Sequence, residues 1–111
     1  MATLSSHLLN SVNGTHASGV KVIIYQINSS RVKKIFLETE TDKEGRILKD
    51  FELSNDDCVC DYEMVCKTAD YFSEKKIVSE IIIKFRMEDP KKKYHLPIII
   101  SPNGYSIWWS Q

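Results

Sequence analysis

The stretch Ile81-Ile-Ile-Lys-Phe-Arg-Met-Glu88 has an apolar side chain at every odd position and charged side chains at positions 84, 86 and 88. A hydrophobic pattern with a period of two predicts a β-strand that buries one of its faces. Other segments with the composition of strands follow one another at short intervals along the chain, separated by turn residues. This spacing favours an all-β fold.

These other segments are rich in β-branched and aromatic residues, which suit strands. They cover residues 20–27, 32–41, 61–67, 94–100 and 105–111. The sequence Asp42-Lys-Glu-Gly45 suits a hairpin or a bulged loop, because glycine tolerates the positive φ angles of such turns. Pro97 indicates an edge position for its strand, since proline has no N–H to donate to a neighbour.

Only residues 68–75 have helical character, with Thr68 placed to cap the helix and Asp70 in its first turn. One short helix beside many strands predicts a β-sandwich of two sheets. With 111 residues and no break in composition, the chain suits a single domain spanning residues 1–111.

The charge balance limits the partners that the protein can have. Lys and Arg together number 15, as do Asp and Glu, so no overall charge attracts a nucleic acid or an anionic membrane. No stretch approaches the length of a membrane span, and the first residues lack the features of a signal peptide. Any binding site must therefore be local.

The three cysteines, Cys58, Cys60 and Cys66, form neither a paired metal-binding motif nor an even disulfide set. We interpret them as reduced thiols of a cytoplasmic protein. The sequence also gives no indication of a metal site or a cofactor.

The chain contains three histidines, and none lies in a Ser/His/Asp spacing or a phosphate-binding loop. Taken alone, His7 and His95 are more typical of hydrogen-bonded structural histidines than of catalytic ones. Arg46 would ordinarily be a solvated residue of a hairpin, and His16 an exposed residue of a loop.

Several motifs change this interpretation, because they resemble in the same order those of the 5-hydroxyisourate hydrolase family. The motifs are Leu4-Ser-Ser-His-Leu-Leu-Asn10, Asp42-Lys-Glu-Gly-Arg46, Lys67-Thr-Ala-Asp-Tyr-Phe72, and Tyr94-His-Leu-Pro-Ile-Ile-Ile-Ser101 followed by Gly104-Tyr-Ser106. The resemblance implies a transthyretin-like two-sheet β-sandwich. It also implies a metal-free homotetramer without a cofactor, in which the sites line a channel between subunits.

Carried over residue by residue, the resemblance places His7, Arg46 and His95 at the catalytic positions of the family. Ring opening of 5-hydroxyisourate needs an activated water, a group that stabilises the developing oxyanion and a proton for the leaving nitrogen. Two histidines and one arginine can supply all three. We expect Arg46 to anchor an oxygen of the substrate through its planar guanidinium, whereas the order of the two histidines in the reaction stays open.

The end of the chain departs from the family, whose usual ending is Tyr-Ser-Thr-Tyr-Arg-Gly-Ser. Here the sequence is Tyr105-Ser-Ile-Trp-Trp-Ser-Gln111, so Trp108 replaces a tyrosine of the substrate site. Strand alternation sets Ser106 and Trp108 on one face, which we expect to contact substrate. For Trp109 we expect a role in subunit contacts. The departure leaves an alternative open: a transthyretin-like carrier without turnover, or a hydrolase of altered specificity.

Overall fold

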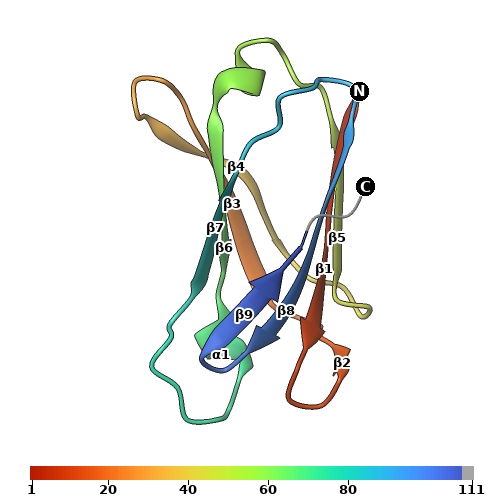
Figure 1. Ribbon diagram of the computed structural model, residues 1–111, viewed down its shortest axis with the longest axis vertical. Coiled ribbons are helices and arrows are strands. Elements are labelled where there is room, and N and C mark those ends of the chain that lie inside the picture. The colour runs from red at the N-terminus through yellow and green to blue at the C-terminus, as the bar shows by residue number, and fades with distance from the viewer. Residues whose placement is uncertain (109–111) are drawn as a thin grey trace.

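The computed structural model describes residues 1–108, which form two β-sheets packed face to face (Figure 1). Sheet A contains β1 (Ala2–Asn10), β2 (Thr15–His16), β5 (Arg46–Phe51), β8 (Lys93–Ser101) and β9 (Gly104–Ile107). Sheet B contains β4 (Lys33–Glu40), β3 (Lys21–Ile27), β6 (Asp61–Cys66) and β7 (Ile81–Phe85), in that spatial order. A 3₁₀ turn (Asp57–Val59) lies between β5 of sheet A and β6 of sheet B, and the helix α1 (Thr68–Tyr71) lies between β6 and β7 of sheet B.

Strand β1 is the centre of sheet A. It pairs in parallel with β8 along one edge, from Thr3 to Asn10. Along its other edge β5 pairs with the first part of β1, and the two-residue strand β2 pairs with Leu9 and Asn10. Segments from both ends and from the middle of the chain therefore meet on one strand.

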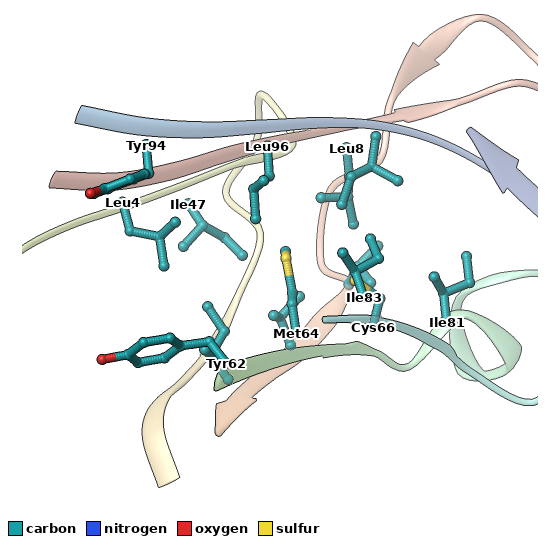
Figure 2. Packing of buried hydrophobic residues seen from close by; sticks show 14 of the residues in the cluster. Leu4, Leu8, Ile47, Tyr62, Met64, Cys66, Ile81, Ile83, Tyr94 and Leu96 are labelled. Atoms are coloured by element: carbon teal, nitrogen blue, oxygen red, sulfur yellow. The ribbon is translucent and has the colours of Figure 1, made fainter. Parts of the chain in front are cut away.

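The core lies between the two sheets, because alternate residues of each strand point inward. In β1 the even-numbered residues are buried and the odd-numbered ones are half-buried. Figure 2 shows Leu4, Leu8 and Leu96 of sheet A facing Met64 and Ile83 of sheet B. This alternation leaves the odd-numbered residues of β1 on the outer face of sheet A.

The predicted strands are confirmed in their main parts as β3, β4, β6, β7 and β8. In and after β7 the alternation holds through residue 88: Ile81, Ile83 and Met87 are buried, whereas Lys84 and Glu88 are exposed. Half-buried strands of this kind can be found from sequence because the pattern follows directly from the pleat.

The predicted helix was wrong in its length and in its cap. The helix α1 ends at Tyr71, because the next residue, Phe72, adopts an extended conformation and buries its ring in the core. Lys67, not Thr68, precedes the first helical residue, and the buried hydroxyl of Thr68 has no hydrogen-bond partner among residues 1–108. Burial of Phe72 thus overrides the helical preference of the residues around it.

Of the hairpin and the bulged loop predicted for Asp42-Lys-Glu-Gly45, the hairpin was wrong, because β4 and β5 belong to different sheets. The segment is a loop in which the Gly45 N–H donates to the Asp42 carbonyl oxygen. The segment crosses from sheet B to sheet A, and the Asp42 carboxylate accepts the N–H groups of Glu44 and Arg46. Gly45 has a φ of 73°, and a Cβ there would collide with the carbonyl oxygen of Leu8. The crossing therefore needs glycine at this position, and it places Arg46 at the start of β5.

The edge position predicted from Pro97 holds for its own part of the strand and not for the whole strand. Strand β8 has β1 along one side, and β9 pairs with Ile98 to Ser101 on the other. Pro97 precedes this second pairing, in the part of β8 whose only strand partner among residues 1–108 is β1. A proline is tolerated there because that part of the strand has one neighbour.

All three cysteines are free, and burial raises the pKa of the Cys66 thiol to about 12. Among the helices in residues 1–108, none is long and apolar enough to cross a bilayer.

Candidate active site

The register of sheet A brings the three predicted catalytic residues onto its outer face. His7 of β1 lies opposite Arg46 of β5. On the other edge of β1, Ser5 lies opposite His95 of β8. Because directly opposed residues project from the same face of a sheet, His7, Arg46 and His95 share the face away from the core.

The side chain of His95 is oriented by Ser5. The Nδ1 atom of the His95 ring lies 2.8 Å from the Ser5 hydroxyl oxygen. The same hydroxyl lies 3.4 Å from the Tyr94 carbonyl oxygen. With Nδ1 occupied, Nε2 is the ring nitrogen of His95 that is available to a ligand.

The side chain of His7 contacts a second imidazole, that of His16. The Nε2 atom of His7 lies 3.0 Å from Nδ1 of His16, and the ring centroids are 5.1 Å apart. Strand β2 makes this contact possible, because it sets His16 opposite Leu9, two residues along β1 from His7. His16 is exposed as predicted, but the prediction of a loop residue was wrong.

The environment of His7 favours its neutral form. Burial lowers the pKa of His7 below its usual value of 6.5, and the positive charges of Arg46, His16 and His95 lower it further. A hydrogen bond with the backbone of Glu44 acts in the opposite direction and favours the protonated ring. The net lowering keeps this imidazole able to accept a proton near pH 7.

Arg46 is exposed at the start of β5, and its guanidinium forms no ion pair with any acidic residue in the range 1–108. The nearby carboxylate of Asp42 is engaged by the backbone: hydrogen bonds from the N–H groups of Arg46 and Glu44 lower its pKa. The guanidinium is thus left to bind an anionic group in planar, two-pronged geometry.

Ser106 also lies on the outer face, since it is opposite Ile99 of β8. Ile107, opposite the buried Ile98, belongs to the inner face. Trp108 follows directly after β9, is 45% exposed, and falls level with Pro97 if the register continues. The prediction for Trp109 lies outside the described residues.

The outer face of sheet A is open in the single chain. A hollow of about 520 Å³ lies elsewhere, at the β3–β4 side of sheet B beside α1, and includes Lys21, Glu38 and Lys67 among its lining residues. None of the predicted site residues lines it. Within residues 1–108, no group of three or more His, Cys, Asp or Glu side chains is arranged to hold a metal ion.

The sequence matches the model of the HIUase/Transthyretin family over residues 4–109. The chain belongs to this family. A 5-hydroxyisourate hydrolase from Salmonella dublin is 32% identical to it over 108 residues, which cover 95% of this chain and 78% of the relative. The family predicted from the motifs is therefore confirmed.

Two solved structures of the family have the same architecture. A 5-hydroxyisourate hydrolase from Klebsiella pneumoniae is 25% identical, with a TM-score of 0.79 and coverage of 100% of both chains. The transthyretin of Sparus aurata, 18% identical, has a TM-score of 0.80 over 96% of this chain and 95% of its own. The predicted transthyretin-like two-sheet sandwich with one short helix is thus confirmed.

Proposed function

We propose that this protein hydrolyses 5-hydroxyisourate, with His7, His95 and Arg46 as its working residues. The observation that carries the proposal is their shared position on adjacent strands of one sheet face. Two imidazoles lie there with an arginine that pairs with no acidic residue among residues 1–108. The family membership and the hydrolase relatives support the same reaction.

The chemistry of ring opening can be assigned to these groups. Water must lose a proton as it adds to the ring carbonyl, and His7 suits this base because its lowered pKa keeps it neutral. Arg46 holds an oxygen of the substrate and offsets the negative charge that develops there. The leaving nitrogen needs a proton when the C–N bond breaks, and the free Nε2 side of a protonated His95 can supply it.

Ser106 and Trp108 complete the substrate-binding surface in this proposal. Ser106 offers a hydroxyl on the same face as the catalytic groups. Trp108 offers a flat apolar wall for a planar ring, in place of the tyrosine of the family.

We also propose that the chain, a single domain, works as a homotetramer in which a second subunit covers the open face of sheet A. Large apolar side chains are exposed on or beside this face: Leu48 of β5 is 71% exposed, and Trp108 after β9 is 45% exposed. Such a surface is costly to leave in water and is typical of subunit contacts. The free thiols fit a reducing compartment, so we place the tetramer in the cytoplasm.

A second candidate function is that of a carrier that binds an aromatic ligand without turning it over. The exposed Trp108, at the position where the chain departs from the family, favours it. The presence of both histidines and the arginine on one face argues for the hydrolase.

One assay separates the two candidates. Freshly generated 5-hydroxyisourate is followed by its ultraviolet absorbance with and without the protein, and we expect a decay well above the spontaneous rate. The double variant His7→Asn/His95→Asn is the control and should return the decay to the spontaneous rate. No acceleration, together with quenching of tryptophan fluorescence by the substrate, would favour the carrier.

A further inference from the structure

His16 is a third imidazole on the face that carries the proposed active site. It lies opposite Leu9, and therefore projects to the same side of sheet A as Leu9 and His7. Strand β2 occupies the same edge of β1 as β5, so His16 and Arg46 flank His7 from that edge. The mechanism proposed above gives His16 no role, although its Nδ1 atom lies 3.0 Å from Nε2 of His7.

The hydrogen bonds of His7 determine which of its nitrogens can exchange a proton. Its bond with the Glu44 backbone favours the protonated ring, so the Glu44 carbonyl must be accepting an N–H. Because Nε2 of His7 is the atom that faces His16, the N–H directed at Glu44 is the one on Nδ1. In the neutral ring Nε2 then carries the lone pair, and it accepts the Nδ1–H of His16.

This arrangement leaves Nε2 of His16 as the outward nitrogen of the pair. We infer that His16 is a further catalytic residue of the proposed hydrolase, the ring that takes the proton from the attacking water and relays it to His7. The inference rests on the proposed function and adds a residue to its general base.

The relay conserves protons and charge. An O–H bond of water breaks, its proton goes to Nε2 of His16, and the electron pair stays on the oxygen that attacks the ring carbonyl. At the same time the Nδ1–H bond of His16 breaks as an N–H bond forms on Nε2 of His7. The positive charge ends on His7, whose Nδ1–H keeps its bond to the Glu44 carbonyl.

The groups around His7 act on this charge from every side. Arg46 of β5 and His95 of β8 oppose it, whereas the Asp42 carboxylate in the crossing segment favours it. Burial is the largest effect that lowers the pKa of His7, and the positive charges of Arg46 and His16 lower it further. The proton stored on His7 is therefore released readily after the C–N bond has broken, while His95 remains the donor to the leaving nitrogen.

The variant His16→Asn tests the relay. Asparagine keeps a short side-chain N–H for Nε2 of His7 but cannot take up a proton from water. We expect kcat for 5-hydroxyisourate to fall about 100-fold, the usual scale for loss of a general base, with little change in KM. The control is Ser18→Ala, an exposed position next to β2, which should retain wild-type kcat.

Two outcomes of the kinetics would overturn the relay. A His16→Asn enzyme with wild-type kcat would mean that His7 exchanges its proton with water directly. A rise in KM at unchanged kcat would make His16 a substrate contact.

A measurement without substrate tests the relay separately from the proposed function. The ¹⁵N shifts of the wild-type imidazoles, followed against pH, should show neutral His7 protonated at Nδ1, and a His7 protonated at Nε2 would overturn the relay. This result holds even if His16→Asn does not fold. If the wild-type protein failed to hydrolyse 5-hydroxyisourate, the proposed function would fall, while these shifts would still decide how the pair is arranged.

Discussion

The outer faces of the two sheets handle their charged groups in opposite ways. Around sheet B the charges pair within the chain: Lys33 lies 2.9 Å from Glu63, and Arg86 lies 2.9 Å from Asp61. The outer face of sheet A has Arg46 and His95 instead, and neither forms an ion pair with an acidic residue in the described part of the chain. A face whose charges are matched offers little to an anionic ligand, whereas an unmatched guanidinium beside imidazoles offers both binding and proton transfer.

The pKa values of the charged groups on the two sheets are shifted in opposite senses. Hydrogen bonding to Glu63 is the largest cause that raises the pKa of Lys33, and hydrogen bonding to Asp61 does the same for Arg86. Both ion pairs favour the charged state that these groups have at pH 7. On sheet A, by contrast, the pKa of His7 is lowered, so its charged state is disfavoured. Perturbation toward the uncharged form is what a general base requires.

The largest expected effect comes from removing an imidazole of sheet A. His95→Asn should lower kcat/KM for 5-hydroxyisourate by about 10²–10⁴-fold, since it removes a proton-transfer group. Steady-state kinetics measures the loss, and a thermal melt checks that the fold is retained. The matched change on sheet B, Lys84→Gln at an exposed position of β7, should leave kcat/KM unaltered. Equal losses in both variants would remove the distinction between the faces.

Arginine to lysine exchanges on the two faces should also differ. Arg46→Lys keeps the charge but loses the planar fork, and we expect kcat/KM to fall by about 10–100-fold. Arg86→Lys changes an arginine that pairs with Asp61 at the edge of sheet B, and it should retain activity. Unchanged kcat/KM in Arg46→Lys would contradict the anchoring role.

A smaller effect is expected where the chain crosses from sheet B to sheet A. Gly45→Ala combines a positive φ of 73° with a collision against the Leu8 carbonyl, and it should destabilise the fold by about 1–3 kcal/mol. Gly14→Ala is the matched control, because Gly14 has a φ of 72° with no atom near its missing Cβ. Denaturant titration gives the free energy of unfolding of both variants. The loss in Gly14→Ala measures the strain of the positive φ, and any additional loss in Gly45→Ala measures the collision. Equal losses would mean that the collision is relieved.

The last prediction concerns Trp108, whose expected effect on kcat/KM overlaps that of Arg46→Lys. If its ring stacks on the substrate, Trp108→Ala should lower kcat/KM by an amount that corresponds to about 1–3 kcal/mol of lost transition-state stabilisation. Trp108→Tyr should lower kcat/KM less, because it keeps an aromatic ring. Replacing residues 108–111 by the family ending Tyr-Arg-Gly-Ser should raise activity. A graft that abolished activity in an intact tetramer would indicate that the native tail serves another substrate or ligand.

Much of the fold was predictable from sequence, because burial on one face leaves a period of two in strands such as β3 and β7. The strand β5 was missed, since Arg46-Ile-Leu-Lys-Asp-Phe51 exposes Leu48 and so lacks a clear alternation. Its pairing with β1 depends on a crossing between sheets that no local pattern reveals. Helix propensity predicted a helix over residues 68–75, which is longer than α1. The helix ends at Tyr71 because Phe72 is extended and buries its ring.

The site was predictable in part, and for a different reason. His7, Arg46 and His95 were found through resemblance to a family, because nothing in their local sequence distinguishes them from structural residues. The register then sets them on one face. The contact of His16 with His7 depends on the two-residue strand β2, too short to leave a periodic signal. Such a contact becomes visible only in three dimensions.

The parallel pairing of β1 with β8 has a consequence for how the protein folds. The hydrogen bond between Ser5 and His95 joins residues 90 positions apart, so the sheet that carries the site closes one of the longest loops available to the chain. Contacts of such high sequence separation form slowly, because the loop entropy is lost before the pairing stabilises anything. During synthesis, β1 therefore stays unpaired along its β8 edge until β8 has been synthesised. Catalytic competence should appear as a late, all-or-none event that follows the emergence of the last strands, and no fragment ending before β8 should possess any of it.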